Sequence, residues 1–277
     1  MKSPWLHRFA ILLAALSLLL IMDGALVVPG TQPAPETLSL HRLAGFALGA
    51  LTVGFVAWLV AAGSRPQMRN LGWIVLIIAI ADGVAGLASV QAAVPRTAGI
   101  AHACLAQMFF AAMIAVALVT SGAWNRGPEF VNDYGWPSMR SLAIFTPLLV
   151  ILQIMLGAGF RQKALTLLPH VLGAMFVALV ILLESIFVLQ QFPVHRSLRP
   201  AAKTLLGVAF AQVFLGMTAL IMKSMANDTD TSVVVTVAAH ITGGAITLAT
   251  TVALSILIRR NVQSRVEEED VEETART

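Results

Sequence analysis

Eight apolar stretches of about 20 residues run through this chain and constrain its fold more than any other feature. A bilayer core about 30 Å thick is crossed by roughly 20 apolar residues in helical conformation. Apolar residues make up 58% of the 277-residue chain and charged residues only 12%, which excludes a disordered chain, a nucleic-acid-binding module and an ordinary cytosolic enzyme. The sequence therefore predicts an all-α integral membrane protein. The predicted spans lie near residues 8–28, 41–62, 70–90, 100–121, 140–160, 169–190, 203–223 and 236–258.

Short polar or proline-containing segments separate the spans, so consecutive helices should be antiparallel neighbours. We expect eight transmembrane helices. From Val266 onward, six acidic residues stand against one arginine. Such a run of like charge is typical of a solvated tail, and residues 263–277 are predicted to form one.

The basic side chains are unevenly divided between the two ends of the predicted spans. Thirteen fall on the side that carries both termini. Because the side richer in Lys and Arg is normally cytoplasmic, we expect both termini in the cytoplasm and the chain in the cell membrane. A cleaved signal peptide at the first span is the alternative, but that stretch has no convincing cleavage site. Five basic residues fall on the opposite side: Arg42, Arg96, Arg161, Lys163 and Lys223.

Four of the six histidines occupy one structural position, at the start of every second span. They are separated by 61, 68 and 70 residues, which is close to one helical hairpin each. This spacing indicates an internal repeat. All four histidines are predicted near the outer face of the membrane. They are His41, His102, His170 and His240.

The repeat extends to the preceding spans and to the residues after each histidine. Each odd-numbered span places an amide or carboxylate in its outer half, at Asp23, Asp82, Gln153 and Gln212. In three of these spans a glycine follows four residues later, at Gly86, Gly157 and Gly216. The fourth residue after each histidine is small, and lies one turn along the same helix face. We expect this stripe to admit a flat ligand or a neighbouring helix. The small residues are Gly45, Ala106, Ala174 and Gly244.

Four histidines at equivalent depth favour a functional site, although a single one is commonly satisfied by an interhelical hydrogen bond. Ionisable groups in membrane spans are costly and usually mark function. Zinc and di-iron sites are disfavoured, because the chain has one cysteine, Cys104, and no His-x3-His or Glu-x-x-His on one helix face. Histidines paired from separate helices suit heme iron with two axial imidazoles.

The remaining polar residues are predicted to have simpler roles. His7 and His195 lie in basic segments and are expected to be exposed to solvent or headgroups. Glu184 lies near the cytoplasmic end of its span and is expected to extend to the interface. Asp23 and Asp82 are expected either to hydrogen-bond neighbouring helices or to line the cofactor pocket.

In order along the chain, five short stretches resemble the heme A synthase family of eight-span membrane proteins, and the likeness extends over nearly the whole chain. Two of them contain histidine: His-Arg-Leu-Ala-Gly at 41–45 and Ala-His-Ala-Cys-Leu-Ala-Gln at 101–107. The others end or centre on glycine: Gly-Val-Ala-Gly-Leu at 83–87, Gln-Ile-Met-Leu-Gly at 153–157 and Gln-Val-Phe-Leu-Gly at 212–216.

The resemblance implies two pseudo-symmetric four-helix bundles, formed by residues 1–125 and 138–262. It also implies an oxidoreductase that converts a methyl group of heme O to the formyl group of heme A for cytochrome oxidase. It implies a resident heme b between His170 and His240, and substrate heme O between His41 and His102. Arg42, beside His41, is a candidate contact for a heme propionate. Implied partners are heme O, membrane lipid, and a heme O synthase or a terminal oxidase assembly, with no nucleic acid.

The sequence departs from the family near the first histidine. The family commonly has a glutamate three residues before it, where this chain has Leu38. The nearest carboxylate is Glu36, five residues before His41, and we take it as the candidate catalytic group. Two other functions fit the same histidines: a non-catalytic diheme b-type electron carrier, and a heme-handling assembly factor.

Overall fold

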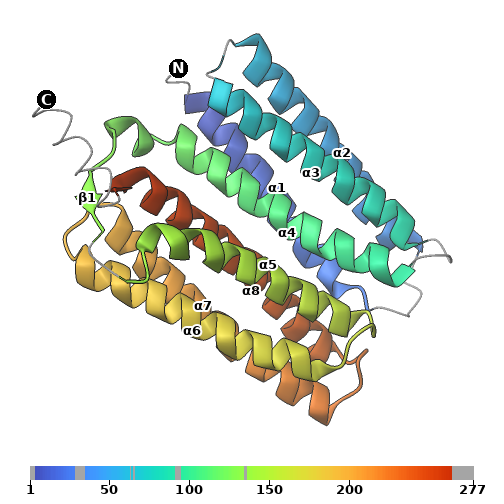
Figure 1. The fold of residues 1–277 in the computed structure, drawn as a ribbon. Helices are drawn as coiled ribbons and strands as arrows, with labels where there is room; N and C mark the ends of the chain where they lie inside the picture. Colours follow the sequence, from blue (N-terminus) through green and yellow to red (C-terminus); the bar gives the residue numbers. More distant parts are fainter. Residues whose placement is uncertain are drawn as a thin grey trace, which may run out of the picture.

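A computed structural model describes residues 4–28, 35–62, 64, 66–90, 95–133 and 136–263. Within them, eight helices are long and apolar enough to cross a membrane, which confirms the all-α membrane fold (Figure 1). The predicted tail lies outside the described residues from 264 onward. The helices are α1 (Pro4–Leu26), α2 (Pro35–Ala61), α3 (Pro66–Ser89), α4 (Pro95–Thr120), α5 (Met139–Arg161), α6 (Leu167–Gln191), α7 (Leu198–Met225) and α8 (Thr231–Asn261).

The first four helices all begin at a proline, several residues before the predicted apolar spans. Proline suits the first helical position, because its fixed φ is helical and the missing N–H would have no partner there. Apolar length therefore predicted the part of each helix that crosses lipid, and underestimated how far the helix extends beyond it.

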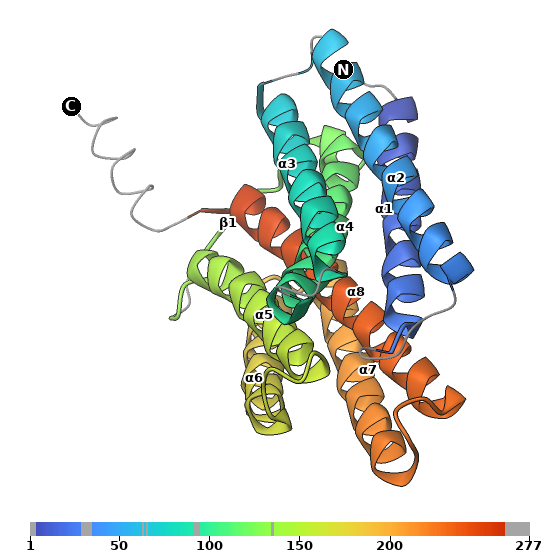
Figure 2. The same ribbon diagram turned by 90° about the vertical axis from the view of Figure 1, so that its right-hand side faces the viewer.

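Helices α1–α4 pack in a closed ring in which α1 contacts α2 and α4, and α3 contacts both α2 and α4. Helices α5–α8 make the corresponding set of contacts. The two groups lie side by side and meet through α1, α4, α5 and α8 (Figures 1 and 2). The predicted domain boundaries and the symmetry between the halves stay predictions.

Small residues line the centre of the molecule, where α4 and α8 are the most deeply buried helices. Ala111 and Ala115 of α4 and Ala245 and Ala249 of α8 are all buried. Without a hydrophobic effect between helices in lipid, such residues stabilise the contact by letting the backbones approach closely. Large apolar side chains fill the rest of the core, as Phe55 and Met113 do, and others face outward, as Phe210 on α7 does with 79% of its surface exposed.

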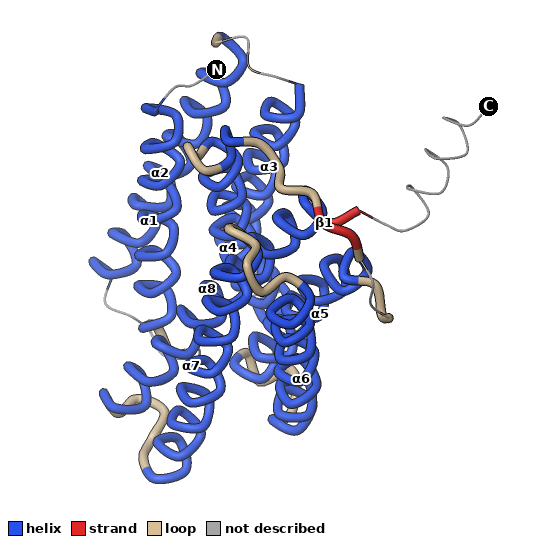
Figure 3. Tube along the Cα trace, turned by 90° about the vertical axis from the view of Figure 1, so that its left-hand side faces the viewer, coloured by secondary structure: helices blue, strands red, loops and turns tan. Residues whose placement is uncertain are grey.

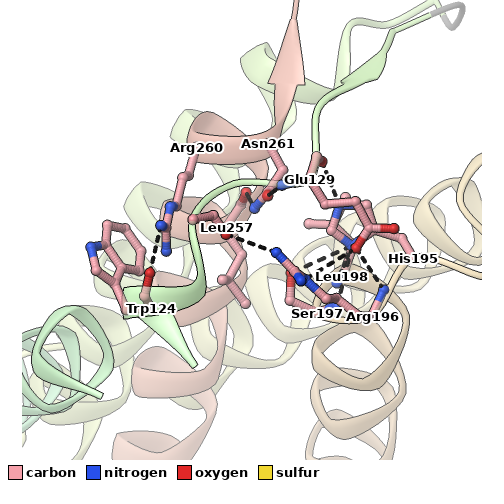
Figure 4. A network of polar contacts seen from close by, with 10 residues as sticks. Trp124, Glu129, His195, Arg196, Ser197, Leu198, Leu257, Arg260 and Asn261 are labelled. Atoms are coloured by element: carbon pink, nitrogen blue, oxygen red, sulfur yellow. Dashed lines mark hydrogen bonds and ion pairs between the residues drawn. The ribbon is translucent and has the colours of Figure 1, made fainter. Parts of the chain in front are cut away.

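The linker between the two halves is attached to the end of α8 (Figures 3 and 4). It contains a 3-10 helix, η1 (Trp124–Arg126), and a short strand, β1 (Val131–Asn132), which pairs in parallel with β2 (Val262–Gln263). The Glu129 backbone N–H donates to Oδ1 of Asn261 at 2.8 Å. The Arg260 guanidinium lies 3.6 Å from the centre of the Trp124 ring and donates to the Trp124 carbonyl. We call these contacts, made by Trp124, Glu129, Arg260, Asn261 and the two strands, the linker clasp.

His195 is buried beside the linker clasp, so the prediction that it is exposed is wrong. Its Nε2 lies 2.9 Å from the Glu129 carbonyl oxygen (Figure 4). Its Nδ1 accepts hydrogen bonds from the backbone N–H groups of Ser197 and Leu198, both at 3.2 Å. His195 therefore caps the first turn of α7, whose N–H groups have no intrahelical partner.

Two other polar residues also differ from prediction. His7 is partly buried and its Nδ1 lies 2.9 Å from the Ala117 carbonyl oxygen, so it joins α1 to α4. Glu184 is fully buried, with its neighbour Ser185 and with Thr146 of α5. It lies seven residues before the end of α6, about 10 Å along the axis, and that face of the helix is covered by protein.

Candidate functional site

The four repeated histidines meet in two pairs, one in each group of helices. His41 of α2 and His102 of α4 have ring centres 6.4 Å apart and ring planes at 85°. His170 of α6 and His240 of α8 have ring centres 6.1 Å apart and planes at 82°. Two pairs with nearly the same geometry arise because all four histidines lie in the first part of an even-numbered helix.

Each histidine ring lies against a glycine of the helix that precedes it in the chain. A Cβ added to Gly86, Gly157 or Gly216 would lie 2.8 to 3.1 Å from Cε1 of His102, His170 or His240 respectively. These are the glycines of the repeat predicted from sequence. The first repeat has the same contact, because a Cβ on Gly24 would lie 3.0 Å from Cε1 of His41. Only glycine leaves room for the ring at these four positions.

In the first pair, aspartates of the preceding helices hold the histidine Nδ1 atoms. Oδ2 of Asp23 lies 2.8 Å from Nδ1 of His41. Oδ1 of Asp82 lies 2.8 Å from Nδ1 of His102, and the Asp82 carbonyl oxygen lies 3.2 Å from the same atom. The Asp23 carboxylate accepts a hydrogen bond from Nδ1–H of His41. At His102 the acceptor is the Asp82 backbone carbonyl, while Oδ1 of Asp82 lies close to the ring without a hydrogen bond in the described chain. Either acceptor places the lone pair of the neutral ring on Nε2.

In the second pair, amides replace the carboxylates and act as donors to the backbone. Nε2 of Gln153 lies 2.8 Å from the carbonyl oxygen of His170 and 2.9 Å from its Nδ1. Nε2 of Gln212 donates to the carbonyl oxygen of His240 at 3.0 Å, and Nδ1 of His240 is buried without a hydrogen bond in the described chain. Both amides pack against glycines, Gly173 and Gly243, three residues after each histidine.

The histidine pairs fit two axial ligands of one heme iron. Metal–imidazole bonds of about 2.0 Å on opposite sides of an ion place the ring centres about 6 Å apart, as both pairs do. Within the described chain, no Nε2 of the four rings makes a hydrogen bond, and no group of three or more His, Cys, Asp or Glu side chains could hold a metal. Each pair therefore supplies two ligands only, and the remaining ligands must come from a group such as a porphyrin.

The basic residues at the histidine end of the helices differ in whether they already bind another group of the protein. Arg161 of α5 donates to the carbonyl oxygens of Ala25 and Val27, at the end of α1, and Lys223 pairs with Asp228. Arg42 and Arg96 are exposed, at the starts of α2 and α4. Arg42, the candidate propionate contact, directly follows His41, and Arg96 precedes His102 on the same helix; no hydrogen bond or ion pair in the described chain engages either.

Glu36 lies in the first turn of α2 with an exposed side chain. Since α2 is helical from Pro35, five residues place Glu36 about 140° around the helix from His41. The structure thus brings Asp23 and Asp82, and not Glu36, into contact with the first histidine pair.

The small residues after the histidines serve partly for helix packing. Gly45 faces Leu20 of α1, because a Cβ added to Gly45 would lie 3.9 Å from the Leu20 side chain. At Gly244 the neighbours are the amides of Gln107 and Gln212, each 3.4 Å from an added Cβ. Gln107 of α4 is buried, and its Oε1 makes no hydrogen bond in the described chain. Gln107 lies where the two halves meet. It was not singled out from the sequence, although it is the one amide in the apolar part of its span.

No family model matches this chain, and no curated protein matches it. Its function is therefore argued from the site, since a helical membrane fold alone does not specify a reaction.

Proposed function

We propose that this protein is a heme-binding membrane oxidoreductase of the heme A synthase type, which oxidises the methyl group of heme O to a formyl group. The observation that supports this best is the presence of two cross-helix histidine pairs with the spacing of axial heme ligands, 6.4 and 6.1 Å between ring centres. Heme b held by His170 and His240 is the resident cofactor, and heme O held by His41 and His102 is the substrate. Dioxygen balances the reaction, with one oxygen atom entering the product and the other leaving as water.

The two pairs have different surroundings, which supports different tasks for the two halves. Heme b supplies one-electron transfer when bound. Asp23 and Asp82 orient the rings of His41 and His102 and keep each Nε2 available as a ligand. Gly24 and Gly86 let those rings lie flush against α1 and α3. Arg42 and Arg96 are exposed in the first part of α2 and α4, which supports a role in pairing with the propionates of the substrate.

The orientation proposed for the protein places the histidine pairs near the outer face of the cell membrane, with both termini cytoplasmic. The sequence assigns thirteen basic residues to the predicted cytoplasmic side of the spans and five to the other side, which supports this orientation. Heme O would then be received at the membrane from a heme O synthase, and the product passed to an assembling terminal oxidase.

The matched geometry of the two pairs also favours a second function, that of a diheme electron carrier. In a carrier both pairs would hold permanent heme b, and the similar ring spacings and ring angles fit two equivalent ligand sets.

Co-expression with a heme O source, followed by chromatography of the extracted hemes, tests the proposal. We expect heme A from the unmodified protein, none from His41→Ala, and loss of heme b absorbance from His170→Ala or His240→Ala. No heme A under conditions where a known synthase makes it, together with two hemes b per chain, would establish the carrier instead.

A further inference from the structure

The two histidine pairs differ in what their Nδ1 atoms contact. In the first pair, both Nδ1 atoms lie 2.8 Å from a carboxylate oxygen, of Asp23 or Asp82. The Asp23 carboxylate accepts the hydrogen bond of its histidine, whereas Asp82 accepts through its backbone carbonyl and brings its carboxylate charge close to the ring. In the second pair neither Nδ1 atom contacts a carboxylate. The amide nitrogen of Gln153 is fixed as a donor by the His170 carbonyl oxygen, so it offers no acceptor to Nδ1–H. Nδ1 of His240 has no hydrogen bond in the described chain.

This difference changes how strongly each imidazole donates electrons. A carboxylate that accepts the Nδ1–H bond raises the basicity of the ring, and its negative charge stabilises a more positive metal on the other side. Iron held by such rings is harder to reduce. An amide that donates to a backbone carbonyl provides neither effect.

The two aspartates differ in how far their side chains are exposed to solvent. The side chain of Asp82 is 22% exposed and that of Asp23 is 46% exposed. Water and ions screen a charge more strongly when it is exposed, so the charge of Asp82 acts on its histidine with less screening than that of Asp23.

We infer that Asp23 and Asp82 are positioning residues that lower the reduction potential of iron bound by His41 and His102 below that of iron bound by His170 and His240. The inference rests on the proposed function, in that both pairs hold heme. It assigns the two halves unequal redox roles through two aspartates, and predicts the larger effect for Asp82.

The test is a spectroelectrochemical titration of the purified full chain, produced with heme b as the only heme. Offering both pairs the same heme removes the influence of porphyrin substituents on the potential. The His240→Ala and His102→Ala variants assign each transition to its pair. We expect two one-electron transitions, with the lower one belonging to His41 and His102.

Asp82→Asn and Asp23→Asn keep the size of the side chain and remove its charge. For Asp82→Asn we expect the midpoint potential of the lower transition to rise by at least about 59 mV. For one electron, this corresponds to a tenfold change in the ferric-to-ferrous ratio at a given potential. For Asp23→Asn we expect a smaller rise. The upper transition should stay in place in both. Asp228→Asn is the matched control. It also removes a carboxylate charge, but Asp228 pairs with Lys223 and does not contact a histidine.

The outcomes separate this inference from the proposed function. Heme at both pairs with equal or inverted potentials overturns the inference alone, as does a heme-replete Asp82→Asn protein whose lower transition is unmoved. The order of the two potentials in the unmodified protein decides the matter even if a variant loses heme. Absence of heme from His41 and His102 would overturn both.

Discussion

At the scale of single residues, the site is built from contacts that fix each imidazole from two directions. A glycine of the preceding helix supports the Cε1 edge of the ring, and in three of the four cases a polar side chain contacts Nδ1. Such support holds a ligand nitrogen in place before the metal group arrives. The glycines should therefore matter as much for heme retention as for helix packing.

Gly216→Ala should weaken heme retention at the second pair by about tenfold or more. The added methyl would lie 2.9 Å from Cε1 of His240, and such overpacking costs about 1–3 kcal/mol. Heme b per protein, measured by absorbance after purification, checks this. Gly207→Ala on the same helix is the control, because nothing lies within 4 Å of its added methyl. Equal heme retention in the two variants would show that the contact does not position the ring.

Asp23→Asn should lower heme A formation more than Glu36→Gln does. Both carboxylates are near His41 in sequence, but Asp23 contacts its Nδ1 and Glu36 lies exposed on another face of α2. We expect both variants to keep the heme b spectrum of the second pair. Extraction and chromatography of hemes from co-expressing cells provide the measurement. A larger loss with Glu36→Gln would return the catalytic role to Glu36.

The histidines and their two pairs were predictable from the repeat and the resemblance, and the contacts around each ring were not. The sequence pattern included three of the four glycines, but it did not show that they lie against the rings. The first repeat breaks the pattern, since Asp23 directly precedes Gly24 and stands about 60° around the helix from the position that Asp82 occupies relative to Gly86. Whether both carboxylates reach an imidazole depends on how α1 and α3 are rotated against α2 and α4, which no local pattern specifies.

At the scale of helices, the two halves are joined at the histidine end by side chains of α5 and the residue that follows it. Arg161 donates to two carbonyl oxygens at the end of α1, at 2.7 and 2.6 Å, where carbonyl groups have no intrahelical donor. A positive charge there also interacts favourably with the helix dipole. Gln162 packs against Gly99 of α4. The sequence marked Arg161 only as a basic residue of the outer side, because its partners are carbonyl groups that any sequence possesses.

Arg161→Gln should destabilise the protein by about 1–3 kcal/mol, the usual cost of losing hydrogen bonds to a charged group. Thermal unfolding in detergent, followed by circular dichroism, measures the change. Lys163→Gln removes a charge from the exposed α5–α6 turn and should leave the midpoint unchanged. If both variants unfold at the same midpoint temperature as the unmodified protein, the α1–α5 contact contributes nothing to stability.

At the scale of the whole molecule, apolar length predicted eight spans. The burial seen in the structure corrected the predicted exposure of polar residues near the ends of those spans. His195 and Glu184 were expected at an interface because of where they stand along their helices. Depth in the membrane, however, does not tell which side of a helix is covered by protein. His195 contacts the linker, a segment far from it in sequence, and Glu184 is fully buried with no hydrogen bond to its carboxylate in the described chain.

The thirteen-to-five division of basic residues predicts cytoplasmic termini. A reporter that is active only outside the cytoplasm should be silent when fused at Val266 and active when inserted in the α5–α6 turn after Lys163. The paired fusions control for expression. Activity at Val266 and silence after Lys163 would reverse the orientation and place the histidine pairs at the inner face.

The linker clasp also bears on the order in which the protein can be completed during synthesis. Its partners on the far side are Arg260, Asn261 and β2, the last described residues of the chain, whereas Trp124 and Glu129 precede the whole second half. Glu129 can contact His195 once the sixth helix and the turn after it are translated, but the clasp contacts themselves form only after the eighth. A chain that terminates before Arg260 leaves the Trp124 carbonyl and the Glu129 N–H without these partners, so a complete clasp marks a chain translated through α8.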